Sequence, residues 1–195
     1  STSDSAYAKM QALAEAFCIK DGPDDFFSIK ARTYIIFTAL YLCECRDKNI
    51  EIGYPATLPG VRDFLNQQTE GLVEHAYRMQ ESEIIAVKNG GLSILTTYAD
   101  GEGAKTFSCI TARIDTYLKV LDDPRIRRFF SKNEIPTHKF HYEQMSIFVI
   151  PLSESAEQGI QISRIVYADL IQGIKKPHKS LENVKPMEKN ALFIL

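Results

Sequence analysis

The sequence has few cysteines and no tryptophan. Its 195 residues include four cysteines, Cys18, Cys43, Cys45 and Cys109, and no two of them have the Cys-x-x-Cys spacing of a redox or zinc motif. The Cys43-x-Cys45 pair lies in an apolar stretch with helical periodicity. Thiols of this kind are typical of reduced, buried side chains in a cytosolic protein, so a disulfide framework or a cysteine metal site is disfavoured.

An excess of charge of either sign is also missing. The 23 Lys and Arg residues are balanced by 25 Asp and Glu residues, which leaves a formal net charge of −2. The chain therefore has no global positive field, and any contact with nucleic acid requires a local patch. Its 45% hydrophobic and 25% charged residues are ordinary for a soluble globular protein, and this composition excludes the disordered and low-complexity classes.

Motifs for nucleotide and nucleophile chemistry are absent from the sequence. No Gly-x-x-x-x-Gly-Lys-[Ser/Thr] segment occurs, so this chain has no P-loop of its own. The glycines of Gly90-Gly91 and Gly101-Glu102-Gly103 are too sparse to replace it, and we predict that they are turn residues. None of Ser93, Ser108 and Ser163 stands in a Gly-x-Ser-x-Gly elbow. A small-molecule enzyme is the least favoured class.

The histidines offer one weak candidate for a metal site. His138 and His141 are three residues apart, and Cys109 or Glu143 would add a further ligand. The pair lies just before a predicted strand, where residues three apart point to opposite faces, so we expect a solvated loop instead. His75 has no companion residues in the sequence.

The first 130 residues carry apolar side chains at the three- and four-residue spacing of amphipathic helices. Asp4 and Thr57 are predicted N-caps, and the acidic pairs Asp24-Asp25 and Asp122-Asp123 favour helix starts. The Gly90-Gly91 pair is expected to weaken or divide the helix that contains it. The predicted helices cover residues 6–19, 26–46, 57–65, 69–80, 83–98 and 104–121, with a short helix after Pro124 that holds Ile126, Phe129 and Phe130.

The predicted helix 26–46 is apolar nearly all round between residues 33 and 45. That stretch is shorter than the roughly 18–20 residues of a membrane span. Charged residues also bracket it closely: Lys30, Arg32, Glu44 and Arg46. We therefore predict that it is the central core helix of a bundle.

The last third of the chain has a different pattern. Residues 145–151 are rich in β-branched and aromatic side chains and end at Pro151, which predicts a buried strand. A helix over 158–174 and a strand over 191–195 are predicted to follow, and this order is typical of a βαβ unit. The expected organisation is an all-α helical domain over 1–135 followed by a partial α/β segment over 136–195.

Both ends of the sequence suggest a segment of a longer protein. The chain begins at Ser1 without an initiator Met or a targeting segment, and it stops on the apolar run 191–195. We expect part of the chemistry to lie outside these residues.

Basic residues cluster at two places. One cluster lies on the predicted short helix: Arg125, Arg127, Arg128 and Lys132. The second lies in the link before the last predicted strand: Lys175, Lys176, His178 and Lys179. Clusters of this density can contact phosphates even on a neutral protein. The alternatives are a solvated helix face with Phe129 and Phe130 turned toward the core, or ion pairs between subunits.

The order of these elements resembles that of type IV secretion coupling proteins of the TraG/TraD type. The segment DDFFSIKARTYIIFTALYL is similar to the first long helix of that family's all-α domain. KTFSCITARIDTYLKVLDDPRIRRFFSK is similar to a helix that runs through an Asp-Pro turn into an Arg-rich short helix. FHYEQMSIFVIPL resembles the return to the motor sheet, and ALFIL resembles the strand that leads to Walker B.

The resemblance implies a mainly α fold: a helical bundle, the all-α domain, followed by a β-α-β fragment of a RecA-like parallel sheet. It implies an all-α domain inserted between Walker A and Walker B of a hexameric ATPase on the cytoplasmic side of the bacterial inner membrane. ATP and Mg²⁺ would bind the parent protein outside this segment, which itself would be non-catalytic, soluble and without membrane contact.

The implied role is recognition of the transported substrate at the cytosolic entrance of the hexamer. The partners would be DNA, relaxosome components, or secreted effector and adaptor proteins. Arg125, Arg127, Arg128 and Lys132 are the candidate contact residues, and no catalytic, cofactor or metal residue is assigned. The alternative is an unrelated helical domain for protein–protein interaction.

Overall fold

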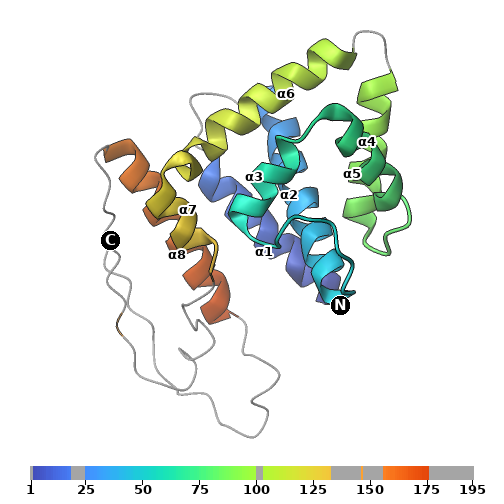
Figure 1. Ribbon diagram of the computed structural model, residues 1–195. Coiled ribbons are helices and arrows are strands. Elements are labelled where there is room, and N and C mark those ends of the chain that lie inside the picture. Colours follow the sequence, from blue (N-terminus) through green and yellow to red (C-terminus); the bar gives the residue numbers. More distant parts are fainter. Residues whose placement is uncertain (1, 19–24, 100–102, 133–145, 147–155, 176–195) are drawn as a thin grey trace, which may run out of the picture. The chain divides into compact units, whose positions relative to one another are not determined.

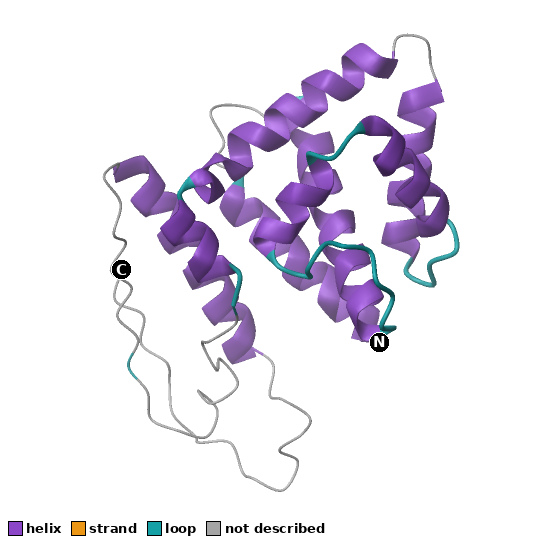
Figure 2. Cartoon of the chain, in the orientation of Figure 1, coloured by secondary structure: helices purple, strands orange, loops and turns teal. Residues whose placement is uncertain are grey.

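The computed structural model describes residues 2–18, 25–99, 103–132, 146 and 156–175. The chain divides into two compact units, Ser1–Lys132 and Asn133–Leu195, which are treated separately below. All the regular structure among the described residues is helical (Figure 2).

The first unit is a helical bundle (Figure 1). Its helices are α1 (Thr2–Phe17), α2 (Phe26–Asp47), α3 (Leu58–Leu65), α4 (Thr69–Met79), α5 (Ile85–Ala99), α6 (Gly103–Leu118), the 3-10 helix η1 (Lys119–Asp122) and α7 (Pro124–Phe130). The mainly helical fold is thus confirmed. Helix α1 begins at Thr2, so the prediction that Asp4 is its N-cap is wrong. Asp4 lies within the first turn of the helix.

Local side-chain caps start three of the helices as the sequence predicts. Asp25 accepts a hydrogen bond from the Ser28 amide at 2.6 Å and begins α2. Thr57 accepts one from the Gly60 amide at 3.2 Å and begins α3. Asp123 caps α7 by accepting a hydrogen bond from the Arg125 amide at 2.8 Å. Each cap satisfies a backbone donor that the first turn of a helix leaves without a partner.

Helix α2 is the centre of the bundle and packs against α1, α3, α5 and α6. Twelve of its residues are buried, including every residue from Tyr34 to Leu42. The helix ends at Asp47, and Asn49, two residues later, lies in the left-handed region with φ 54°. The Ile50 amide donates a hydrogen bond back to the Cys45 carbonyl at 2.8 Å. This is the Schellman geometry, which satisfies carbonyls at the end of the helix.

Within the described ranges, α2 is the one helix whose length and composition would allow it to cross a membrane. A buried core helix has the same length and composition. In this bundle 56% of its most apolar window is buried against neighbouring helices. The protein interior therefore covers much of the apolar surface that lipid would otherwise cover.

Helix α5 corrects one prediction about glycine. Gly90 and Gly91 were expected to be turn residues that divide the helix, but α5 is continuous from Ile85 to Ala99. A Cβ on Gly90 would lie 2.3 Å from the Phe37 ring, and one on Gly91 would lie 2.6 Å from the Ala76 carbonyl oxygen. The two glycines therefore allow α5 to approach α2 and α4 more closely than any other residue would.

The four cysteines match the expectation of burial only in part. All four fall within the described residues, and none of them forms a disulfide there. Cys18 and Cys45 are buried and Cys43 is half-buried, whereas Cys109 is exposed. The prediction of a buried Cys109 is wrong because the buried stripe of α6 contains Ile110 and Ile114, and Cys109 lies one residue outside it.

In the second unit the structure describes Ser146 and α8 (Ala156–Lys175). This confirms the helix predicted over 158–174. Ile162, Ile165, Val166 and Leu170 are buried at helical spacing. The predicted strands over 145–151 and 191–195 lie outside the described residues except for Ser146, which has no regular structure. The strands and the division at residue 135 stay predictions.

Alanine at Gly90 or Gly91 should destabilise the bundle, although alanine normally favours a helix by about 1 kcal/mol over glycine. The added methyl group would overlap Phe37 or Ala76, and such overpacking costs about 1–3 kcal/mol. Gly71→Ala in α4 is the matched control, because its Cβ would meet only the movable end of the Gln67 side chain. Urea unfolding of the three variants measures the difference, and equal stabilities would contradict the close approach.

Candidate functional site

The candidate contact residues lie on and just after α7, the short helix that follows α6 through η1. Val120 and Leu121 of η1 are buried, as is Ile126 of α7. Pro124 occupies the first turn, where its missing amide hydrogen costs no hydrogen bond. These features fix the position of α7 in the bundle and decide which of its basic side chains can reach solvent.

Two ion pairs connect this region to α3. Arg127 of α7 pairs with Asp63, and Arg62, the neighbour of Asp63 on α3, pairs with Asp122 of η1. The side chain of Arg62 is only 12% exposed, so its pair is better shielded from water than an ordinary surface pair. The four side chains hold α7 and η1 against α3. Arg127 thus has an internal structural partner.

Arg125 also has an internal partner. Its guanidinium donates to both carboxylate oxygens of Asp123, at 3.1 Å from Nε and 2.7 Å from Nη2. The hydrogen bonds from the Arg125 side chain, together with that from its amide, lower the pKa of Asp123 to about 2. The charge of Arg125 is therefore balanced locally, and its guanidinium is largely engaged at the cap.

The remaining exposed part of this region is the α7 surface, which we define as Arg128, Phe129 and Lys132. All three side chains are exposed, Phe129 by 49%. Within the described part of the chain, the Arg128 guanidinium has no carboxylate partner. The alternative in which Phe129 turns toward the core is wrong, because Ile126 occupies the buried position of this helix. Phe130 is half-buried, and its ring lies edge-on to that of Phe129 with 5.0 Å between the ring centroids.

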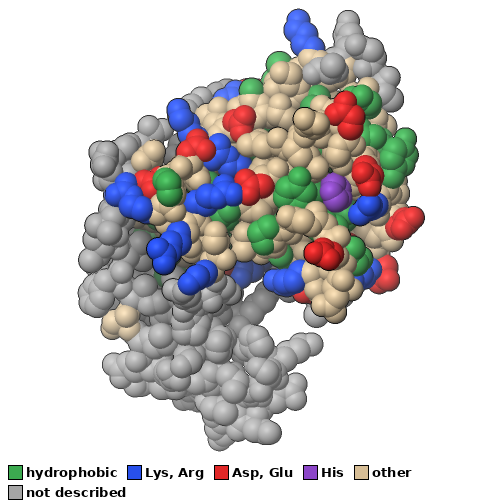
Figure 3. Space-filling model, viewed as in Figure 1, with side chains coloured by type: hydrophobic (Ala, Val, Ile, Leu, Met, Phe, Trp, Pro, Cys, Tyr) green, Lys and Arg blue, Asp and Glu red, His purple; other side chains and the backbone are tan. Residues whose placement is uncertain are grey.

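Figure 3 shows how the charges are distributed around this region. Lys and Arg side chains gather over η1, α7 and the adjacent part of α3, and carboxylates lie between them. The mixture agrees with the ion pairs described above. The positive cluster seen in the sequence is therefore smaller in the structure than its four residues suggest.

The other sequence candidates fall mostly outside the described residues. Of the second basic cluster only Lys175 is described, as the last residue of α8. His138, His141 and Glu143 lie outside the described residues as well. Among the residues that are described, no three His, Cys, Asp or Glu side chains come together as a metal site.

One titratable pair was not found from the sequence. His75 of α4 was expected to have no companion, but its Nδ1 lies 3.2 Å from the hydroxyl of Tyr41 on α2. Phe64 packs against both of these rings, and Tyr54 packs edge-on against the His75 ring. Burial lowers the pKa of His75, helped by the charge of Arg78, and burial raises the pKa of Tyr41. Both groups are held neutral, as in a structural hydrogen bond between helices.

Described residues of the helical unit line at least two clefts. The larger, of about 610 Å³, is lined by residues of α1, α2 and α5 and by the segment before α5. The smaller, of about 400 Å³, is lined by Leu65, Thr69, Tyr98, Phe107 and Asp115 among others. Neither contains a group of catalytic side chains. The larger is considered further below.

Comparison with known proteins adds one finding. The family model described as type IV secretory system conjugative DNA transfer matches residues 2–195. No curated protein and no solved structure matches the chain significantly. The match covers both units and agrees with the resemblance noted in the sequence.

The two arginines of α7 should respond differently to charge reversal. Arg127→Glu places a carboxylate opposite Asp63, and we expect a loss of about 1 kcal/mol and a melting temperature lower by about 2–4 °C. Arg128→Glu should leave the melting temperature unchanged within about 1 °C, because it breaks no ion pair. The double variant Arg127→Glu with Asp63→Lys should recover much of the loss. Thermal melts followed by circular dichroism decide this, and a failure of recovery would argue against the pair.

His75 should make stability depend on pH. Its pKa is lower in the folded state, so the unfolded state takes up the proton first as the pH falls below about 6.5. The free energy of unfolding should therefore decrease between pH 7.5 and 5.5. In His75→Gln, which keeps a hydrogen-bonding group but does not titrate, that decrease should be smaller. Urea unfolding at both pH values tests this, and equal decreases would show that His75 titrates normally.

Proposed function

Because the chain belongs to the type IV secretory family of conjugative DNA transfer, as a segment of TraG/TraD coupling-protein type, we propose that its helical unit recognises the transported substrate. The unit would contact DNA, relaxosome proteins, or effector and adaptor proteins at the cytosolic entrance of a hexamer. The match to residues 2–195 is the observation that carries this proposal. Family membership also argues against an unrelated interaction domain.

The chemistry of ATP hydrolysis belongs, in this proposal, to other parts of the parent protein. ATP and Mg²⁺ would bind there, and the present segment would be non-catalytic. In support, the chain contains no P-loop motif. The titratable pair of the bundle, Tyr41 and His75, is held neutral between packed rings. The protein would act on the cytoplasmic side of the bacterial inner membrane, with α2 in the core of the helical unit.

The α7 surface is the part of the helical unit that best fits contact with DNA. Arg128 offers a guanidinium to a phosphate, and the exposed ring of Phe129 offers a face on which a base can stack. Arg127 and Arg125 would support this surface through their internal pairs. A single-stranded substrate suits the arrangement, because base stacking on aromatic rings does not depend on sequence.

A double variant in the full-length coupling protein tests the proposal. Arg128→Glu with Phe129→Ala removes a phosphate contact and a stacking ring while leaving the ion pairs of α7 intact. We expect plasmid transfer between cells and cross-linking to single-stranded DNA to fall by about tenfold or more, because each contact contributes roughly 1–3 kcal/mol. ATPase activity and the amount of protein in the membrane should not change.

Lys105→Glu is the matched control, because Lys105 is an exposed basic residue of α6 outside the α7 surface. It should transfer DNA as the unaltered protein does. Wild-type transfer and cross-linking by the double variant would contradict the role of the α7 surface.

A further inference from the structure

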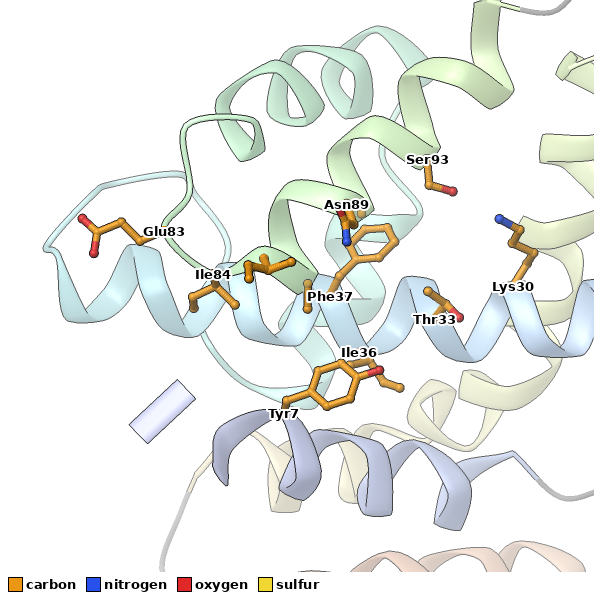
Figure 4. Close-up of a pocket in the computed structure, with 12 residues that line it drawn as sticks. Tyr7, Lys30, Thr33, Ile36, Phe37, Glu83, Ile84, Asn89 and Ser93 are labelled. Carbon is orange, nitrogen blue, oxygen red and sulfur yellow. The ribbon is translucent and has the colours of Figure 1, made fainter. Parts of the chain in front are cut away.

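The larger cleft has the form of a binding groove rather than of a packing defect. It is open along α2, with Tyr7 of α1 on one side and Asn89 and Ser93 of α5 on the other (Figure 4). Ile36 and Phe37 form its floor, and both are buried. Its volume of about 610 Å³ is that of a site for a large ligand or several side chains.

The rim of this groove exposes large apolar side chains. Ile85, at the start of α5, is 75% exposed, and Tyr7 is 42% exposed. Exposed apolar side chains scattered singly are common, but here two of them border one apolar hollow. Burying them against a partner would remove apolar surface from water at about 25 cal/mol per Å².

The two ends of the groove carry opposite charges. Lys30 lies at one end and Glu83 at the other (Figure 4). The ammonium group of Lys30 lies 5.8 Å from the Phe26 ring and has no carboxylate partner among the described residues. The Glu83 side chain is 89% exposed, with Lys48 at 3.7 Å. The charge of Lys30 is open to a partner in the groove, and the exposed Glu83 carboxylate, although paired with Lys48, can also accept a hydrogen bond from a basic group of that partner.

The distance between the two charged ends of the groove can be estimated along α2. Glu83 is the neighbour of Ser82, whose hydroxyl donates to Glu44 of α2 at 2.5 Å. Lys30 and Glu44 are 14 residues apart on one helix, which corresponds to about 21 Å at 1.5 Å per residue. A docked helix of about 14 residues would span the groove from one charge to the other.

We propose that this groove binds one amphipathic helix of a partner protein. The partner helix would run parallel to α2, with an acidic first turn at Lys30 and a basic last turn at Glu83. Its apolar stripe would lie on Ile36 and Phe37, between Tyr7 and Ile85. The inference rests on the proposed recognition function and specifies the chemistry of one protein partner.

Three properties of the groove favour this occupant. Grooves between helices accept the apolar stripe of a further helix. Acidic residues in the first turn and basic residues in the last turn also stabilise an isolated helix through its dipole. The charges that the groove requires of a partner helix are therefore the ones that favour helix formation. DNA fits poorly, because Lys30 is the one basic residue among the described residues that line this groove and Glu83 would repel phosphates.

The direct test uses the full 195-residue chain and a synthetic peptide. The peptide is a fluorescein-labelled helix of about 14 residues, with glutamates in the first turn, leucines at three- and four-residue spacing, and lysines in the last turn. We expect saturable binding by fluorescence anisotropy. Ile85→Glu should weaken it by about tenfold or more, and Leu92→Glu should not change it. Leu92 is the matched control, since it is 51% exposed on the same helix but does not line the groove.

A second experiment exchanges the charges at the two ends of the groove to test the orientation of the bound helix. Lys30→Glu with Glu83→Lys should weaken binding of this peptide several-fold and should strengthen, by a similar factor, binding of a peptide whose terminal charges are exchanged. For each protein, the affinity for one peptide is divided by the affinity for the other, and the two ratios are compared. A difference in helicity between the peptides affects both ratios equally and therefore cancels. No binding to the unaltered chain, or equal binding by Ile85→Glu, would overturn the proposal. A dimer of the chain that Ile85→Glu dissociates, seen by sedimentation, would overturn it in favour of self-association.

Transfer assays in the full-length protein separate this inference from the proposed function. Reduced transfer by Ile85→Glu, with normal transfer by Leu92→Glu, supports the groove. Normal transfer by Ile85→Glu together with reduced transfer by Arg128→Glu/Phe129→Ala would overturn the groove and leave the recognition function standing. Normal transfer by both variants would overturn both.

Discussion

The burial of α2 is the constraint on which the rest of the helical unit depends. A helix that is apolar nearly all round needs neighbours on every side, and α1, α3, α5 and α6 provide them. One close contact lies where Gly90 of α5 meets the ring of Phe37, because a Cβ there would lie 2.3 Å from the ring. Because Gly90 has no side chain, α5 can lie against α2, and Gly91 allows the same approach to α4. The same approach places Asn89 and Ser93 beside α2, where they line the larger cleft.

Much of the fold could be predicted because its determinants are local. Asp25 and Thr57 cap their helices through amides three residues away, so the pattern is complete within a short stretch of sequence. The Gly90-Gly91 pair shows where this reasoning ends. Local rules associate paired glycines with turns, whereas Phe37 and Ala76, which require their small size, are distant in sequence.

The candidate site was predicted less completely for the same reason. The cluster of basic residues on α7 is visible in the sequence, but the partner of Arg127 is Asp63, 64 residues earlier. His75 and Tyr41 are 34 residues apart. Spacing within the sequence cannot identify such pairs, and it cannot identify a groove formed by three helices. Sequence spacing therefore overestimates the free positive charge on α7 and does not identify the groove along α2.

The small size of the free positive patch has a consequence for how such a domain would hold DNA. With a net charge of −2, the chain cannot attract DNA by a general field, and the α7 surface offers few phosphate contacts. About two contacts to a single strand would lose affinity by roughly tenfold between 50 and 200 mM salt, far less than a protein with six to ten. Weak contacts of this kind release the strand readily. Under the proposed function they would suit a domain that passes its substrate onward, and the proposed helix-binding groove would select the protein partner that delivers it.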